Sequence, residues 1–133
     1  SSTDGNWGTP VELTTASPYS MNHQPAISSD GAKVVFECTN ETYSGVGCIC
    51  EVGTDGQGFR VVLTPTDSPV GLPDEADMHS PDYAPDGSIV SLWLNRPGGS
   101  GDHELKVMTS DGSSYFMLVT GVDVLDIGLG CGN

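Results

Sequence analysis

Apolar residues along this chain come in short runs separated by Gly, Pro, Asp and Ser. The runs cover residues 25–28, 33–38, 48–52 and 59–63, and then 82–84, 89–94, 104–108 and 115–119. Runs of this length, rich in Val, Ile, Phe and Tyr and bounded by turn residues, indicate β-strands. No window keeps a helical period, and 18 Gly and 9 Pro residues would interrupt most helices. The pattern therefore predicts an all-β chain.

The same pattern occurs twice, with a period of 56 residues. The Asp-Gly pairs Asp30-Gly31 and Asp55-Gly56 recur as Asp86-Gly87 and Asp111-Gly112. The two segments align without a gap, which places His23 on His79. Asp-Gly favours a hairpin turn because Gly accepts a positive φ, and the Asp side chain can cap its own backbone. Each repeat is therefore predicted to be a four-stranded antiparallel meander with structural turns at these pairs.

The turn sequences resemble those of a known family. SSDGAKVVFEC (28–38) and APDGSIVSLWLN (84–95) resemble the S-P-D-G signature of TolB-type, WD-like β-propeller repeats. CICEVGTDGQG (48–58) and LKVMTSDGSS (105–114) resemble that family's second turn, and the resemblance covers residues 21–120. Ser29 replaces the usual Pro, and Glu37 and Cys38 are unusual in a second strand. The resemblance implies that each meander is a propeller blade.

On this interpretation the chain holds about two and a half blades. Residues 1–15 are expected to be the outer strand of a partial blade, because TDGNWGTPVELT resembles TDGQGFRVVLT at 54–64. Residues 21–65 and 77–121 are the two blades, and 122–133 are a candidate inner strand of a following blade. A closed propeller needs four to eight blades. Three arrangements remain open: part of a longer propeller, a ring of three copies, or head-to-tail copies that exchange strands and form a filament.

Charge narrows the range of partners. Four basic residues against 18 acidic ones give a net charge of −14. Nucleic acid and anionic membrane surfaces are therefore excluded as expected partners, because both require clustered cations. The acidity serves solubility or attracts Ca²⁺ or a basic partner. No apolar run reaches the length of a membrane span, and a chain that opens with Ser1 is compatible with a processed secreted protein or an excised segment.

The cysteines point to an oxidising compartment. They are Cys38, Cys48, Cys50 and Cys131. Cys48-x-Cys50 is too tight for a usual zinc site, whereas Cys38 and Cys48 flank one hairpin loop and are expected to lie opposite each other. A Cys38–Cys48 disulfide would leave Cys50 for Cys131; a Cys38–Cys50 bond, or four buried thiols, are also open. Asn40-Glu41-Thr42 is an N-glycosylation pattern on the same loop, which together with the cysteines favours an extracellular protein.

Candidate chemistry is sparse. Gly98-Gly99-Ser100-Gly101 lacks the pattern of a hydrolase nucleophile elbow. His23 and His79 are repeat-related and each is expected just before an inner strand, which favours a role in the blade; the alternative is that both face the central channel beside Asp82 and hold a metal or ligand. The acidic stretch with Asp74, Glu75 and Asp77 is expected to be a solvated connector between blades, the alternative being a Ca²⁺ site. Trp7 and Trp93 are predicted to pack between blades.

These observations predict a non-catalytic extracellular structural module. Its blades would pack with copies of itself or with adjacent blades into an oligomer or filament, with no catalytic residue and no cofactor assigned. Two alternatives remain: a propeller that binds a ligand or protein, and the propeller part of a larger secreted hydrolase.

Overall fold

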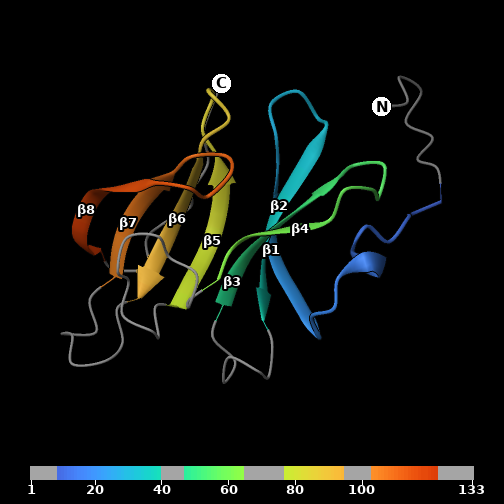
Figure 1. Cartoon of the computed structure of the whole chain (residues 1–133), viewed down its shortest axis with the longest axis horizontal. Helices are drawn as coiled ribbons and strands as arrows, with labels where there is room; N and C mark the ends of the chain where they lie inside the picture. Colours follow the sequence, from blue (N-terminus) through green and yellow to red (C-terminus); the bar gives the residue numbers. More distant parts are fainter. Residues whose placement is uncertain (1–8, 40–46, 65–76, 95–102, 123–133) are drawn as a thin grey trace.

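The computed structural model describes residues 9–39, 47–64, 77–94 and 103–122. Eight strands form two four-stranded antiparallel sheets, each with its strands in sequence order (Figure 1). Sheet one contains β1 (Met21–Ile27), β2 (Lys33–Thr39), β3 (Gly47–Gly53) and β4 (Arg60–Leu63). Sheet two contains β5 (Asp77–Tyr83), β6 (Ile89–Leu94), β7 (His103–Met108) and β8 (Tyr115–Val122). The prediction of an all-β chain is confirmed, and each repeat folds as one antiparallel meander.

The Asp-Gly pairs form the turns within each sheet. The four glycines have positive φ angles of 70°, 78°, 83° and 74° at Gly31, Gly56, Gly87 and Gly112. Each aspartate accepts a hydrogen bond through Oδ1 from the backbone N–H two residues later, at 2.9–3.0 Å. The Asp side chain thus replaces a backbone acceptor while Gly supplies the left-handed conformation.

The gap-free repeat alignment is wrong by one residue in the second strands. Ile27 pairs with Val34, whereas Tyr83, 56 residues after Ile27, pairs with Ile89, which is only 55 residues after Val34. In the first hairpin of sheet one, the N–H of Ser28 donates to the carbonyl of Lys33, five residues later. In the equivalent hairpin of sheet two, the N–H of Ala84 donates to the carbonyl of Ser88, only four residues later, so this turn is one residue shorter. The turn after the third strand compensates for this difference. There the N–H of Gly53 donates to the carbonyl of Gln57 in sheet one, whereas the N–H of Thr109 donates to that of Ser114 in sheet two, where the turn is one residue longer. Val34 therefore corresponds to Ile89 in space, and Cys38 to Trp93.

The two sheets pack face to face, with β5 lying against β1, β2 and β3 of sheet one. Apolar side chains from both sheets form one core between them: Val35, Ile49, Val62, Leu63, Met78, Tyr83, Ile89, Trp93 and Met108. Trp93 is fully buried there, as predicted, and Lys106 Nζ lies 4.4 Å from its ring centroid. Each large apolar side chain buried in this way contributes about 1.5–3 kcal/mol.

The other face of sheet one holds a second cluster and the disulfide. Phe36, Cys38, Cys48, Cys50 and Val52 are buried there, with Leu13, Tyr19, Val34, Phe59 and Val61 packed against them. The disulfide joins Cys38 to Cys50, with 6.1 Å between their Cα atoms. This corrects the expected Cys38–Cys48 pairing. Cys48 is directly opposite Cys38 in the register, but Cys50 lies on the same face one pleat away, within bonding reach.

Several predictions differ from the structure or concern residues outside the described part. Residues 9–13, expected as the end of an outer strand, are not in a strand, because no neighbouring strand in the described chain pairs with them; the 3-10 turn η1 (Thr14–Ala16) follows. His23 and His79 lie inside β1 and β5 rather than before them. The remaining predictions concern residues outside the described part: Trp7, Asn40, Asp74, Glu75, Gly98 to Gly101, Cys131 and the segment 123–133; the side chain of Asp77 is likewise not described.

Candidate functional site

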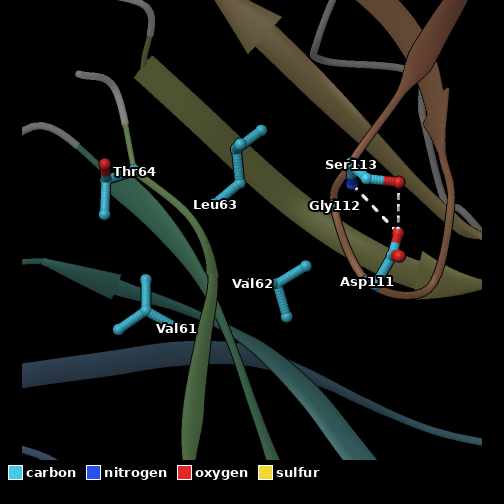
Figure 2. Close-up of a pocket in the computed structure, with 7 residues that line it drawn as sticks. All are labelled: Val61, Val62, Leu63, Thr64, Asp111, Gly112 and Ser113. Carbon is cyan, nitrogen blue, oxygen red and sulfur yellow. Dashed lines mark hydrogen bonds between the residues drawn. The ribbon is translucent and has the colours of Figure 1, made fainter. Parts of the chain in front are cut away.

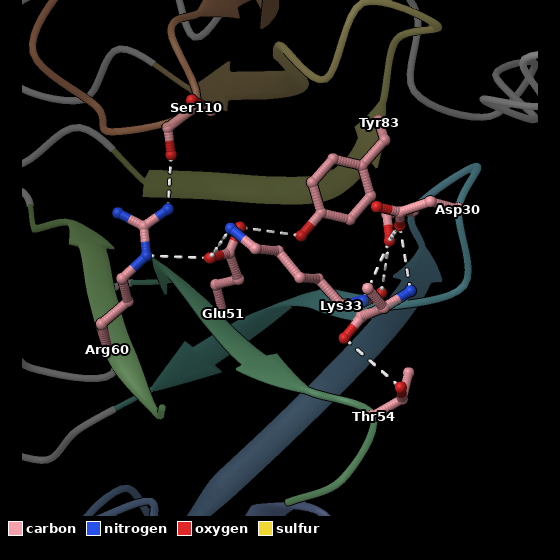
Figure 3. Close-up of polar contacts among 9 residues, drawn as sticks. Asp30, Lys33, Glu51, Thr54, Arg60, Tyr83 and Ser110 are labelled. Atoms are coloured by element: carbon pink, nitrogen blue, oxygen red, sulfur yellow. Dashed lines mark hydrogen bonds and ion pairs between the residues drawn. The ribbon is translucent and has the colours of Figure 1, made fainter. Parts of the chain in front are cut away.

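The most elaborate polar site lies where the two sheets meet, around Glu51. This residue is in the middle of β3 on the face toward sheet two, and only 3 % of it is exposed. Its Oε1 accepts hydrogen bonds from Lys33 Nζ at 3.0 Å and Arg60 Nε at 2.8 Å (Figure 3). Its Oε2 accepts a hydrogen bond from the Tyr83 hydroxyl of sheet two at 2.9 Å. A carboxylate in an apolar strand is thus paired on both oxygens, as burial of a charge requires.

The electrostatics of the pair fix both protonation states near neutral pH. Burial alone would raise the pKa of Glu51, but hydrogen bonds from Arg60, Lys33 and Tyr83 outweigh it and hold the pKa below its usual range. Burial, and then the hydrogen bond to Glu51, raise the pKa of Tyr83 well above that of a free tyrosine. Near neutral pH, Glu51 is therefore ionised, and Tyr83 is protonated and donates a hydrogen bond. Such a pair holds two surfaces together and is poorly matched to proton transfer near neutrality.

Further polar contacts join the sheets. Arg60 Nη2 donates to the Ser110 carbonyl at 2.5 Å. Gln24 Oε1 accepts hydrogen bonds from Ser80 N at 2.7 Å and from Ser80 Oγ at 3.0 Å. Nδ1 of His79 lies 3.3 Å from Glu37 Oε2. Sheet two thus contributes its first strand, β5, and one turn, and sheet one contributes side chains from all four of its strands.

Gln24 and Ser80 are equivalent positions in the two repeats and share an unusual conformation. Their φ angles are 47° and 48°, and both lie at a break in strand register, between His23 and Ala26 and between His79 and Asp82. A positive φ is uncommon for residues other than Gly, so its repetition marks a β-bulge that belongs to the repeat. The bulge turns the N–H of Ser80 toward the neighbouring sheet, where Gln24 accepts it.

Two hollows accompany this contact. One, of about 250 Å³, is lined by acidic, basic and hydroxyl groups that include Asp30, Lys33, Glu51, Tyr83 and Asp86. The other, of about 270 Å³, lies between β4 and the turn that contains Asp111 (Figure 2). At its edge Gly112 approaches so closely that an added Cβ would overlap the Val62 carbonyl.

The basic residues of the described chain are concentrated at the sheet contact. Lys33 and Arg60 bind Glu51, and Lys106 covers Trp93 in the core between the sheets. The 18 acidic residues of the sequence are matched by only four basic ones. The rest of the described surface is therefore dominated by negative charge.

The alternative of a metal or ligand site formed by His23, His79 and Asp82 is not assembled in this form. His79 lies beside Glu37 of the other sheet, and His23 borders a different hollow on the far face of sheet one. Among the described residues no group of three His, Cys, Asp or Glu side chains is arranged to hold a metal ion.

Sequence reasoning did not identify the Glu51 cluster. Its signal was present in the repeat itself, because Glu51 aligns with Val107 and is a charge inside an apolar strand. The scarcity of cations was a second signal, since two of only four basic residues serve this one carboxylate.

Neither a known family model nor a curated protein matches this sequence. Among the described residues, no helix has the length and apolar character needed to cross a membrane. The function therefore has to be argued from the geometry.

Proposed function

We propose that this chain is a non-catalytic, extracellular structural module of the β-propeller type. Its two sheets act as consecutive blades, and its role is to pack with further blades, from copies of itself or an adjoining segment, into a larger assembly. The observation that carries the proposal is the face-to-face packing of two repeat-related meanders through the inner strand of the second. In such an array the same type of contact recurs between each unit and its neighbour.

The character of the sheet contact supports a structural role. Its polar centre joins an anionic Glu51 to a neutral Tyr83, an arrangement suited to a lasting contact. The Cys38–Cys50 disulfide, which ties β2 to β3, is compatible with an oxidising, extracellular setting. A strongly acidic chain also keeps separate assemblies apart in solution.

Electron microscopy of the native material, at neutral pH and without reductant, tests this proposal. Filaments with a regular repeat, or discrete rings, are the expected results, because both are built from stacked blades. Small particles of monomer size in native material would contradict the structural role.

A second candidate is a binding module, which the polar hollow of about 250 Å³ beside Glu51 favours. Its mixed lining suits a small polar molecule that carries both donors and acceptors. NMR titration with amino acids, monosaccharides and inorganic phosphate separates the two candidates, because binding would shift the resonances of Lys33 and Tyr83. Unchanged spectra would leave the structural role as the better account.

A further inference from the structure

The inner strands β1 and β5 occupy equivalent places in the two sheets but differ in burial. In β5, Pro81 and Tyr83 are buried, and Tyr83 lies in the core shared with sheet one. The equivalent residues of β1, Pro25 and Ile27, are exposed, and Ile27 is 61 % accessible. Leu13 and Tyr19 pack against the buried cluster on the far face of sheet one, while five of the seven residues of β1 are exposed. The surface with which β5 docks on sheet one thus has a counterpart in β1 that is open in the described chain.

The surface that receives β5 also has a counterpart, on sheet two. Glu51 of β3, which receives the Tyr83 hydroxyl, corresponds to Val107 of β7. Val107 lies between Lys106 and Met108, which are buried toward sheet one, so strand alternation places it on the opposite face. Val107 is half-buried. It pairs directly with Val90, so this part of the face is apolar.

The two open surfaces are chemically matched to each other. Where the observed contact sets Glu51 against Tyr83, the equivalent contact between two copies would set Val107 against Ile27. At this pair the acceptor and the donor are thus both replaced by aliphatic groups, so neither side leaves an unpaired polar group there. Facing Glu51 itself, Ile27 would leave one carboxylate oxygen without the donor that Tyr83 supplies. The exposed strand β1 therefore fits this face of sheet two better than it fits a second copy of sheet one.

We infer that two copies of this chain associate head to tail, with β1 of one copy lying across the open face of sheet two of the next, and Ile27 against Val107. The inference rests on the proposed structural role and names the partner and contact through which that role is exercised. Because the two surfaces are different and lie at opposite ends of the pair of sheets, the contact is heterologous. It adds copies in one direction until a ring closes or a filament grows.

Variants of the full chain that introduce a charge on one of the two surfaces test this contact. Ile27→Lys and Val107→Glu each place one unpaired charge in it, and sedimentation velocity over a range of protein concentrations measures self-association. Each variant alone should weaken association at least about tenfold, because an isolated charge is costly to bury. An equimolar mixture of the two variants should recover association, since Ile27 of the Val107→Glu copy can then meet the unchanged Val107 of the Ile27→Lys copy, and the introduced lysine meets the introduced glutamate at the alternate contacts.

Ser114→Lys is the matched control, because Ser114 is exposed in the turn of sheet two that faces β4 within the same copy, away from both surfaces. Circular dichroism establishes that each variant is folded. Ile27 is mostly exposed, so Ile27→Lys remains informative even if Val107→Glu destabilises the chain. In that case Ile27→Lys should still reduce association, and Ser114→Lys should not.

The outcomes separate this inference from the proposed function. The head-to-tail contact is overturned if both variants associate as strongly as wild type, or if their mixture does not recover association. Either result leaves the proposed structural role unaffected. A wild-type chain that stays monomeric while native material shows filaments overturns the head-to-tail contact as well, because the partner blade is then another protein. Monomers in native material would remove the structural role itself.

Discussion

At the scale of single residues, Glu51 determines how the two sheets are joined. Its carboxylate neutralises two cations of its own sheet and accepts one hydroxyl from the other. The cations are only partly buried, with side chains 51 % and 36 % exposed for Lys33 and Arg60, so water screens part of their attraction. Glu51 thus acts mainly by keeping a buried site fully hydrogen-bonded. Its removal should lower the free energy of unfolding by more than the loss of its ion pairs alone.

The first prediction concerns Glu51→Gln. The amide has one acceptor oxygen instead of two, so it cannot serve Lys33, Arg60 and Tyr83 together, and we expect a loss of about 1–3 kcal/mol in the free energy of unfolding. Urea denaturation followed by circular dichroism measures it. Glu12→Gln is the control, since it makes the same chemical change at an exposed position. Equal stabilities for the two variants would show that the cluster does not stabilise the fold.

The second prediction concerns pH. The folded pKa of Glu51 is lowered from its ordinary value of 4.5, so its stabilising effect is present above that pH and is lost as pH falls through the folded pKa. The folded pKa of Tyr83 is raised above its ordinary value of 10.0, so its contribution is lost as pH rises beyond 10. The difference in Tm between wild type and Glu51→Gln should therefore shrink in acid, and that between wild type and Tyr83→Phe should shrink in strong alkali. Differences that are constant with pH would contradict both assignments.

At the scale of elements, the turns have two separate tasks. All four Asp-Gly turns reverse a strand, but the turn at Gly112 also touches the neighbouring sheet at Val62. Gly56, its counterpart in sheet one, has a similar φ of 78° and open space around it. The same motif thus serves only local geometry in one place and packing between sheets in the other.

The third prediction compares Gly112→Ala with Gly56→Ala. Both force alanine into a left-handed conformation at a cost of about 1–2 kcal/mol. At Gly112 the new methyl group would also overlap the Val62 carbonyl, so we expect a further loss of about 1–3 kcal/mol as the sheets shift apart. Thermal unfolding of the two variants measures the difference. Similar Tm values would show that the turn at Gly112 does not hold sheet two against sheet one.

The strands and turns could be predicted from the sequence because they depend on local chemistry. Asp-Gly pairs and apolar runs indicated all eight strands to within a few residues, although β1 and β5 begin four to five residues earlier than expected. The one-residue offset of β6 was hidden because two adjacent turns differ in length by compensating amounts. The Glu51 cluster was hidden because it forms between strands far apart in the chain, and only the docking of β5 brings Tyr83 to Glu51. The disulfide was left open because several cysteine pairs were within reach of a single hairpin.

At the scale of the whole molecule, the two sheets share one core and one polar cluster. Neither sheet alone encloses Trp93, Ile49 or Glu51, since each of these lies on a face that the other sheet covers. The disulfide lies on the far side of sheet one, in a separate cluster of buried residues. Its effect on sheet two can therefore be transmitted only through the stability of sheet one, which makes it a probe of how strongly the sheets are coupled.

The fourth prediction is that reducing the Cys38–Cys50 disulfide destabilises both sheets together. A bond between cysteines 12 residues apart restricts the unfolded chain, and its loss costs about 3 kcal/mol in a chain-entropy estimate. In a Trp7→Phe background, Trp93 fluorescence reports on the contact with sheet two, while far-UV circular dichroism reports on all strands. Because the shared core links the sheets, both signals should shift to lower denaturant by the same amount and remain coincident. A circular dichroism transition that precedes the Trp93 transition would instead mean that sheet one unfolds by itself, and that the contact through β5 is weaker than a blade-to-blade interface requires.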